Sequence, residues 1–377
     1  MIDIKNEEDC CGCAACMQRC PKQCITMQSN EKGFLYPLVN TTQCINCGLC
    51  EKVCPIINQS EPHEPIEIFA AKNKDEEIRR QSSSGGVFTM LAEETIKKGG
   101  VVFGVKFNKK WQPEFDFTET IEGITPFRGS KYIQAIVGNA YIKAEEFLKV
   151  GREVLFSGTP CQIAGLKKYL RKEYENILYV SIACHGVPSP LVWEEYLNFK
   201  GINIADIASV SMRNKEFGWR NYQLYIESKS GHCLCKEKKY ECSYLHGFIR
   251  SLYLRPSCYA CKFKEGRCGC DLLIADFWGI EDVIPLYNDD KGTSLIVTYS
   301  TKALDIAKSM NFPYTINKEQ AFNKNHCIIH STPKNEYSPI FWDLWKKEKY
   351  NANNKLLKQF RTTKYKRIIN KIKSIFQ

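Results

Sequence analysis

The chain carries near its N-terminus the stretch Cys10-Cys11-Gly12-Cys13-Ala14-Ala15-Cys16-Met17-Gln18-Arg19-Cys20-Pro21. The same spacing returns in Cys44-Ile45-Asn46-Cys47-Gly48-Leu49-Cys50-Glu51-Lys52-Val53-Cys54-Pro55. Counted from Cys10 and from Cys44, both stretches follow the pattern C-x2-C-x2-C-x3-C-P. A structural zinc site needs four cysteines in two pairs, so it leaves the third close cysteine, the proline and the repetition unexplained.

The duplicated pattern is typical of a bacterial ferredoxin with two 4Fe–4S clusters. Three closely spaced thiolates wrap one face of a cubane, and the fourth thiolate, before the proline, binds the other cluster. Two ligand sets are therefore predicted: Cys10, Cys13, Cys16 and Cys54, and Cys44, Cys47, Cys50 and Cys20. Cys11 and Cys24 fall outside the pattern and are predicted not to be ligands.

The composition limits the classes of protein that the chain can represent. Its 377 residues suggest two or three domains and enough material for a core. Its 20 cysteines are too many for a cytosolic enzyme unless they bind metal. The acidic start, residues 1–9, lacks the apolar stretch of a signal peptide, and no run of about 18 apolar residues predicts a membrane span. We therefore expect a cytoplasmic protein, in which a disulfide framework is disfavoured.

The positive charge is concentrated at the C-terminus. From Lys346 onward the chain has 11 Lys or Arg and one acidic residue, so this segment holds ten of the eleven net positive charges. The rest is nearly neutral, and no nucleic-acid partner is predicted. From Leu356 onward apolar residues recur at helical spacing between the basic ones. This basic amphipathic tail predicts either a terminal helix docked on the body or peripheral contact with the inner face of a membrane.

Beyond residue 65 strands and helices alternate in the predicted pattern. A linker with two prolines, residues 60–65, separates this body from the N-terminal module. Strands of the body are predicted at 69–71, 101–105, 115–118, 154–157, 177–183, 222–227, 272–277 and 294–299, and its helices at 87–98, 141–150, 162–170, 191–199 and 244–254. One further short strand, at 33–39, is predicted within the N-terminal module. The predicted fold class is an α/β body, a mixed sheet with flanking helices, with an N-terminal α+β module like a bacterial ferredoxin and a helical basic tail.

Four further cysteines form a candidate metal site in the body. Cys161 and Cys184 follow predicted strands, and α/β sheets place their sites at the carboxyl ends of strands. Cys258 and Cys261 form a CxxC pair. By spacing alone, these two single thiols and one pair only suggest a set of four ligands. Three other cysteines are taken as surface or core thiols: Cys233, Cys235 and Cys242.

Six motifs occur in a fixed order along the chain. They are Gln81-Ser82-Ser83-Ser84-Gly85-Gly86-Val87, Arg128-Gly129-Ser130-Lys131-Tyr132, Thr159-Pro160-Cys161-Gln162, Cys184-His185-Gly186, Leu254-Arg255-Pro256-Ser257-Cys258-Tyr259-Ala260-Cys261 and Asp276-Phe277-Trp278-Gly279. Together they resemble the beta-subunit family of the deazaflavin (coenzyme F-420) hydrogenases and dehydrogenases, in the branch with a fused N-terminal ferredoxin module. That family also includes the reductase of the 7-hydroxymethyl group of chlorophyll. The resemblance covers about residues 1–300.

The resemblance implies a third 4Fe–4S cluster in the body, held by Cys161, Cys184, Cys258 and Cys261, with an FAD beside it. The candidate cofactor-binding residues are Ser83, Ser84, Gly85, Gly86, Lys131 and Thr159. Small residues before a helix suit a flavin phosphate, because the backbone can approach it and the helix offers free N–H groups. An ordinary serine N-cap is the structural alternative.

For catalysis the sequence offers only His185 and Lys131 as candidates, with a structural histidine and a solvated lysine as the alternatives. The Asp276-Phe277-Trp278-Gly279 motif fits core packing as well as catalysis.

One departure from the family pattern creates a rival metal site. The sequence Cys268-Gly269-Cys270-Asp271 stands where family members usually have a small or polar residue and then aspartate. Cys258, Cys261, Cys268 and Cys270 therefore form a local alternative set for zinc or for the cluster. We favour the family set, since the rival leaves Cys161 and Cys184 unexplained.

The hypothesis that follows is an iron–sulfur flavoprotein oxidoreductase. Electrons from a soluble ferredoxin or similar one-electron donor pass through the ferredoxin-type clusters and the core cluster to FAD, and then to an unidentified two-electron acceptor. The acceptor is a deazaflavin, another small molecule or a sugar intermediate. The alternative is a non-catalytic electron-transfer beta subunit that serves a partner redox subunit in a larger dehydrogenase or hydrogenase.

The expected domain boundaries follow the motifs. Residues 1–60 form the two-cluster ferredoxin-type domain, and residues 61–150 and 151–312 form the N-terminal and C-terminal parts of the body. Residues 313–377 form a C-terminal extension with the basic tail.

Overall fold

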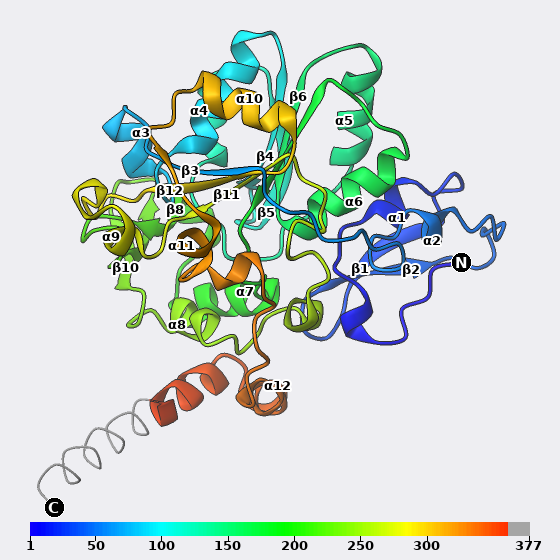
Figure 1. Ribbon diagram of the computed structural model, residues 1–377. Helices are drawn as coiled ribbons and strands as arrows, with labels where there is room; N and C mark the ends of the chain where they lie inside the picture. The colour runs from blue at the N-terminus through cyan, green and yellow to red at the C-terminus, as the bar shows by residue number, and fades with distance from the viewer. Residues whose placement is uncertain (361–377) are drawn as a thin grey trace, which may run out of the picture.

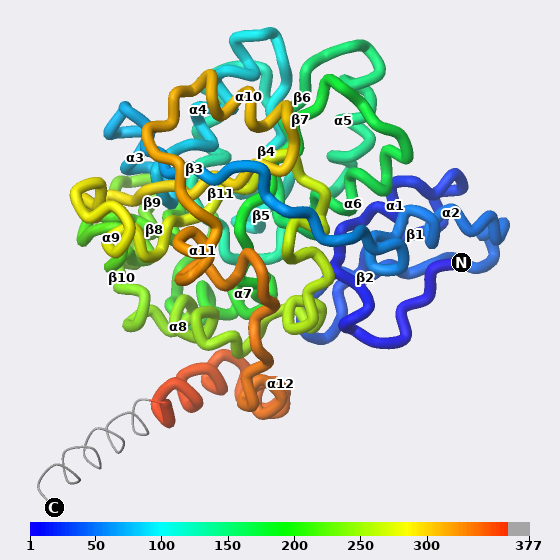
Figure 2. Tube along the Cα trace, viewed as in Figure 1, coloured from blue at the N-terminus to red at the C-terminus, as the bar shows by residue number. Residues whose placement is uncertain are grey.

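The structure is a computed structural model of the chain, and it describes residues 1–360. Figure 1 shows a small N-terminal module beside a larger body built around a central sheet, with the last helices below the body. The tube in Figure 2 shows that the chain leaves the module through one extended segment and then enters the sheet. Residues 361–377 of the predicted tail helix lie outside the described part of the chain.

The N-terminal module is small and built around one antiparallel strand pair. Its strands are β1 (Ile25–Ser29) and β2 (Leu35–Val39), and its short helices are α1 (Ala15–Gln18) and α2 (Leu49–Lys52). Ile25 pairs with Val39 and Ser29 pairs with Leu35. The first cysteine motif precedes β1 and contains α1, and the second follows β2 and contains α2. This is the α+β arrangement expected for the module.

In the described residues, eight strands form the sheet of the body in the order β13-β3-β12-β11-β7-β6-β4-β5. Their bounds, in chain order, are β3 (Glu67–Ala71), β4 (Val101–Phe107), β5 (Pro113–Thr118), β6 (Val154–Gly158), β7 (Ile177–Ile182), β11 (Leu272–Asp276), β12 (Ser294–Thr298) and β13 (Tyr314–Thr315). The central strands β4, β6, β7 and β11 are parallel, and the outer neighbours on both sides pair antiparallel. The sheet is therefore mixed, as predicted.

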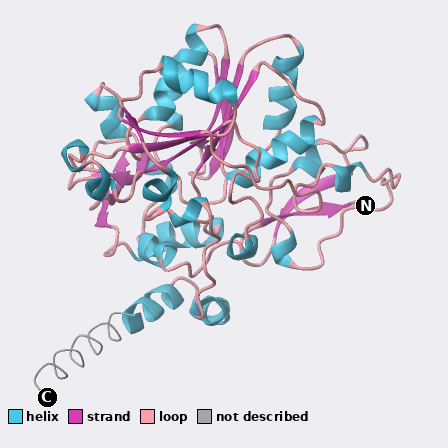
Figure 3. Ribbon diagram, viewed as in Figure 1, coloured by secondary structure: helices cyan, strands magenta, loops and turns pink. Residues whose placement is uncertain are grey.

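Helices cover both faces of this sheet (Figure 3). On one face, α4 (Val87–Lys97) and α10 (Thr301–Ser309) share a core with Val102 and Leu155. On the other face, α5 (Ala140–Lys149), α6 (Pro160–Leu170) and α11 (Lys318–Phe322) pack on Val101 and Phe156. Neighbouring residues of a strand point to opposite faces, so the continuous apolar runs of the central strands follow from burial on both sides.

A second sheet and three helices form the rest of the body. The sheet has the antiparallel order β10-β9-β8, with β8 (Ile207–Asn214), β9 (Gln223–Ser228) and β10 (Cys233–Lys238). Its core includes side chains of α7 (Pro190–Phe199), α8 (Ser243–Ile249) and α12 (Tyr337–Glu348). Residues 351–360 are also helical, and Leu356 and Leu357 are buried in the same core. The described start of the predicted tail therefore docks on the body.

The described chain also contains several shorter helices, of which three bear on the sites below. They are α3 (Glu76–Gln81), before the serine-glycine run, α9 (Ile280–Val283) and the 3-10 helix Pro256–Ala260 that carries Cys258. Along residues 1–360 no helix combines the length and the apolar character that crossing a membrane requires.

The helix predicted at 244–254 is shorter than expected. It ends at Ile249, and Ser251 adopts a left-handed conformation with φ 56°. This turn lets Leu254 pair with Pro188 and lets the N–H of Arg255 donate to the carbonyl of Val187 at 2.9 Å. The early end of the helix thus brings the CxxC pair beside the loop that contains Cys184.

Candidate metal centres and cofactor site

The two cysteine motifs have the same backbone conformation. Gly12 and Asn46, each two residues after the first cysteine, have φ values of 73° and 52°. Ala14 and Gly48, each just after the second cysteine, have φ values of 61° and 70°. A left-handed conformation is unfavourable for alanine, so its presence at Ala14, at the position that Gly48 takes in the second motif, indicates a loop shape that the site requires. In each motif, the loop turns its closely spaced cysteines toward a common centre of its own.

The eight motif cysteines line two separate cavities. One cavity, of about 330 Å³, is lined by Cys10, Cys13, Cys16 and Cys54. The other, of about 350 Å³, is lined by Cys44, Cys47, Cys50 and Cys20. Each cavity thus receives three cysteines from one motif and the last cysteine of the other, which is the crossed grouping that the sequence predicts. The donor set of each cavity fits a 4Fe–4S cluster, and ligation by these residues stays a prediction.

The two cysteines predicted not to be ligands also line these cavities, Cys11 the first and Cys24 the second. Cys24 is buried, and its Sγ lies 3.4 Å from that of Cys20. Cys11 interacts with Cys13 on one side and with Cys161 on the other. Among residues 1–360, no three His, Cys, Asp or Glu side chains converge closely enough to hold a single metal ion.

The four body cysteines come together at the carboxyl edge of the sheet. Cys161 is the second residue of α6, directly after β6, and Cys184 follows β7. The pKa of Cys184 is raised well above its usual value, first by burial and then by the thiols of Cys258, Cys161 and Cys261. Burial and the neighbouring thiols likewise raise the pKa of Cys258 to about 12. These thiols stay protonated at neutral pH until a cation displaces their protons.

Local contacts hold this set in place. Thr159 caps α6 in a reciprocal capping box with Gln162, and its hydroxyl lies 3.3 Å from the Sγ of Cys161. The N–H of Val187 points at the Sγ of Cys258 at 3.5 Å. The ammonium of Lys264 donates to the carbonyl of Cys184 at 2.6 Å. Thr159, predicted to bind a cofactor, therefore begins the helix that carries Cys161.

The rival cysteine set is less complete. Cys268 and Cys270 are buried and interact with each other, which lowers the pKa of Cys268 and raises that of Cys270. Cys261 lies near both Cys161 and Cys268. Cys184 lies near Cys161, Cys258 and Cys261, whereas the main partner of Cys270 is Cys268. This grouping favours the family set, and which set binds metal stays a prediction.

The predicted flavin loop has most of its polar groups engaged. Ser84 donates to the carbonyl of Thr293 at 2.7 Å, and the N–H of Gly85 donates to Ser294 Oγ at 3.0 Å. A Cβ on Gly85 would lie 2.5 Å from the carbonyl oxygen of Ala71, so this glycine is needed for close packing of the backbone. Gly86 is the N-cap of α4 and makes no side-chain cap, so the helix keeps N–H groups for an anion.

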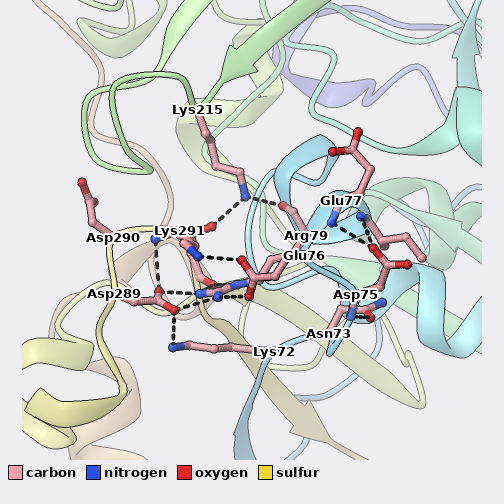
Figure 4. A network of polar contacts seen from close by, with 12 residues as sticks. Lys72, Asn73, Asp75, Glu76, Glu77, Arg79, Lys215, Asp289, Asp290 and Lys291 are labelled. Carbon is pink, nitrogen blue, oxygen red and sulfur yellow. Dashed lines mark hydrogen bonds and ion pairs between the residues drawn. The ribbon is translucent and has the colours of Figure 1, made fainter.

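The loop is anchored by the ionic network in Figure 4. Arg79, at the end of α3, is 2% exposed and donates to Asp289 at 2.7 Å. Lys72 donates to the same carboxylate at 3.0 Å. The ammonium of Lys215 donates to the carbonyls of Arg79 at 2.6 Å and Ser84 at 3.0 Å. These contacts fix the serine-glycine run against the start of β12.

The two candidate catalytic residues are both engaged within the protein. The ammonium of Lys131 donates to the carbonyls of Arg128 and Gly129 at 3.1 and 3.2 Å, and burial lowers its pKa to about 7. His185 pairs with Ser251 through Nε2 at 3.0 Å and lies near Thr332 through Nδ1. Burial, and then Lys264, lower the pKa of His185 to about 4. The neutral imidazole has the contacts of a structural histidine.

Sequence reasoning missed Arg213, which lies beside the flavin loop. It is buried and pairs with Asp276, while its Nε and Nη2 have no hydrogen-bond partner in the described residues. The Tyr132 hydroxyl lies close to both Arg213 and Ser130, and Ser130 is 2.7 Å from Ser83. A buried guanidinium with free donors beside these hydroxyls fits an acceptor-rich ligand such as a flavin.

The Asp276-Phe277-Trp278-Gly279 motif packs against this residue. The indole of Trp219 stacks on Trp278 with ring centres 4.2 Å apart, and its Nε1 donates to Asp276 at 3.1 Å. Phe277 is completely buried. The motif therefore packs against Arg213. The motif can be recognised in the sequence, whereas a single arginine in a strand, such as Arg213, carries no sequence signal.

Comparisons with known proteins identify the family of the chain. Cysteine-lined cavities beside an α/β sheet are typical of an iron–sulfur protein that transfers electrons. Residues 9–56 match the family of 4Fe–4S dicluster domains. Residues 68–141 match "Coenzyme F420 hydrogenase/dehydrogenase, beta subunit N-term", and residues 151–321 match the corresponding C terminus. The chain belongs to this beta-subunit family, with a dicluster domain fused at its N-terminus.

A search of curated proteins found no match. Among solved structures, the chain is similar to one from the xenon-derivatised F420-reducing NiFe hydrogenase complex of Methanosarcina barkeri. The identity is 15%, the match covers 80% of this chain and 94% of that one, and the TM-score is 0.46. The predicted family and fold class are confirmed. The chain is an oxidoreductase-family protein that transfers electrons through 4Fe–4S clusters.

Proposed function

We propose that the chain is a reductase with three 4Fe–4S clusters and one FAD, which delivers electron pairs to a small-molecule acceptor. The bound clusters supply one-electron transfer and the flavin supplies the conversion to a two-electron reduction. Cys10, Cys13, Cys16 and Cys54 hold one cluster, Cys20, Cys44, Cys47 and Cys50 hold the second, and Cys161, Cys184, Cys258 and Cys261 hold the third.

One observation carries the proposal: the first cysteine motif is in direct contact with the body cysteines. Cys11 interacts with both Cys13 and Cys161. A Cβ on Gly165, in α6, would lie 2.8 Å from the Cβ of Cys13, so the motif loop sits directly on this helix. A ferredoxin module that only served another protein would need no such contact. The contact supports electron transfer within one chain.

The second cavity faces outward and suits an external donor. Cys47 is exposed, and Ile45, on the same rim, is 59% exposed. An apolar rim beside an accessible cluster is the surface that a one-electron donor such as a soluble ferredoxin would contact. On this proposal the chain receives electrons at Cys47 and passes them inward past Cys13.

The flavin is proposed to lie at the serine-glycine run. The free N–H groups at the start of α4 would bind its phosphates, and the unpartnered donors of Arg213 would bind an acceptor of the flavin or of the substrate. Lys131 stays a candidate through its motif, although its ammonium is held by backbone carbonyls. His185, with both ring nitrogens engaged, is assigned a structural role within the proposal.

Anaerobic purification of the full chain, with counts of iron, acid-labile sulfide and flavin and an absorption spectrum, tests this assignment. We expect about twelve irons and one FAD per chain, since each cubane has about four irons. Zinc without sulfide, or a colourless protein even after reconstitution, would contradict the proposal.

The second candidate, an electron-transfer subunit without its own substrate site, draws on the beta-subunit family itself. Turnover by the isolated chain separates the two. Reduced protein that is reoxidised by a small artificial acceptor, but gives no product with a deazaflavin or any other candidate substrate, would favour the subunit.

A further inference from the structure

Arg255 lies between the first cysteine motif and the body cysteines and is completely buried. Its Nε donates to the carbonyl of Cys10 at 2.8 Å, and its Nη2 donates to the carbonyl of Leu35 at 3.0 Å. Its guanidinium also lies 4.2 Å from the ring centre of Tyr36. Because Arg255 belongs to the body and all three contacts are in the module, this one side chain bridges the two.

The charge of Arg255 has no carboxylate partner. Residues 1–360 contain three buried arginines: Arg79 pairs with Asp289 and Arg213 pairs with Asp276, but Arg255 forms no ion pair in this part of the chain. Its Nη1 also has no hydrogen-bond partner and lies beside Gly12, in the loop between Cys11 and Cys13. A buried cation without a counter-anion is costly, so the folded protein must supply negative charge nearby.

The groups that can supply this charge are the cysteines on both sides. Cys10 and Gly12 belong to the loop around the first cavity. On the body side, the N–H of Cys258 donates to the carbonyl of Arg255 at 2.9 Å, and the positive charge of Arg255 acts on Cys161 and Cys258. Four thiolates and four sulfides outweigh the charge of the iron in a cubane, so each bound cluster carries net negative charge. Arg255 is thus placed to neutralise two clusters at once.

We propose that Arg255 is a positioning residue whose buried guanidinium is the shared counter-cation of the first N-terminal cluster and the body cluster, and that it raises the reduction potential of both. This inference rests on the proposed function, since it needs both clusters. A positive charge favours the state with the extra electron, so each cluster accepts one electron more readily. No bond forms or breaks, and the electron comes from the external one-electron donor.

Lys264 provides a comparison, because its charge is near only one of the two sites. Its ammonium donates to the carbonyls of Cys184 and Cys327, and it acts on Cys184 and Cys261. Arg19 provides a control at the same module–body contact, because it is partly exposed to solvent, which screens its charge, and its guanidinium contacts Glu145 and Tyr169. Substitutions of Arg255, Lys264 and Arg19 should therefore change the reduction potentials of the two clusters in three different ways.

The test is an anaerobic redox titration of the full-length, cluster-loaded protein, followed by electron paramagnetic resonance. Signals are assigned with Cys54→Ala and Cys161→Ala, each of which removes one ligand set. Arg255→Met should lower the electron affinity of both clusters about tenfold, which is about 59 mV for a one-electron couple. Arg255→Lys, which keeps the charge, should change both reduction potentials less than Arg255→Met does. Lys264→Met should shift only the body cluster, and Arg19→Gln should shift neither.

Unchanged potentials in Arg255→Met, or a shift of one cluster only, would overturn the inference. If Arg255→Met does not fold or load iron, Tyr36→Glu tests the same charge. It places a carboxylate beside the guanidinium, which offsets the positive charge, and it leaves the hydrogen bonds of Arg255 to Cys10 and Leu35 in place. Tyr36→Glu should lower both potentials and Tyr36→Gln should lower neither; equal potentials in the two variants would overturn the inference. Wild-type protein without three clusters would instead contradict the proposed function.

Discussion

At the scale of single residues, cysteine spacing carries most of the information. The spacing groups eight cysteines into two crossed sets, and the same sets line two cavities. Arg213 and Arg255 could not be found in this way, because each is one arginine among many and its burial depends on segments far apart in the chain. Arg255 lies in a motif, but the motif gives no reason for an unpaired charge.

Cys161→Ala should remove about four irons per chain, those of the body cluster, and leave the two N-terminal clusters in place. The reason is that Cys161 interacts with the other three body cysteines, whereas Cys270 interacts with Cys268. Iron and sulfide counts after anaerobic purification measure the loss. Cys233→Ala, at an exposed thiol, is the control and should lose no iron. Loss of iron in Cys270→Ala, with none in Cys161→Ala, would support the rival set.

Asp289→Asn should destabilise the protein by roughly 2 kcal/mol, because it removes the main anion of the buried Arg79 and leaves only the exposed Glu76 at 3.4 Å. The effect stays this small because Asp289 itself is 39% exposed and solvent screens its charge. Burial alone would raise the pKa of the Asp289 carboxyl, but hydrogen bonds from Arg79 and Lys72 hold it below its usual 3.8. A lowered pKa stabilises the folded state above about pH 4 and loses this effect on acidification. The difference from wild type should therefore be constant between about pH 5 and 8 in anaerobic urea unfolding.

The control for this change is Glu77→Gln, which removes an exposed ion pair with Arg80 on the same helix. An exposed pair contributes little, so this variant should unfold like the wild type. Equal effects of the two substitutions would show that the network around Asp289 does not anchor the flavin loop.

At the scale of elements, the sequence predicts the parallel centre of the sheet well. Strands β4, β6, β7 and β11 are apolar runs buried on both sides, and the motifs fall at their ends. Short half-exposed elements such as β1, β8 and β10 lack such a pattern and were missed. The early end of α8 was also missed, because the left-handed turn at Ser251 is set by pairing of Leu254 with Pro188.

Gly165→Ala in α6 should destabilise the protein by about 1–3 kcal/mol, although alanine normally favours a helix over glycine by about 1 kcal/mol. The new Cβ would lie 2.8 Å from the Cβ of Cys13 and 2.8 Å from the Tyr141 hydroxyl. Thermal unfolding should show the loss, and iron counts should fall at the first N-terminal site. Lys168→Ala on the same helix is the control. A Gly165→Ala variant as stable as the control would argue against close docking of the module.

At the scale of the whole molecule, the N-terminal module is part of the body's core. Cys13, Ala15 and Val53 belong to the same buried cluster as residues of α5 and α6. The Gln18 side chain accepts hydrogen bonds from the start of α5, and Ser189 donates to the carbonyl of Lys32. The proline-containing linker predicted a separable module, and only the tertiary structure reveals how much apolar surface the two parts share.

We therefore expect the cluster-loaded full chain to unfold in one cooperative transition under anaerobic calorimetry. Residues 61–377 expressed alone should expose the apolar faces of α5 and α6, bind a hydrophobic dye and unfold at a lower temperature. Two well-separated transitions in the full chain, or a truncated body as stable as the whole, would contradict a shared core.

The exposed position of Cys47 has a consequence for how the protein survives air. Of the eight cysteines predicted to bind the two N-terminal clusters, Cys47 alone is exposed, whereas Cys13 is buried against the body. Dioxygen and chelators therefore reach the outer cubane first. Brief aeration should bleach the brown colour in two stages, with the outermost iron lost early and the inner iron retained. Loss of the outer cluster would then stop the supply of electrons, while the buried clusters and the flavin stay intact.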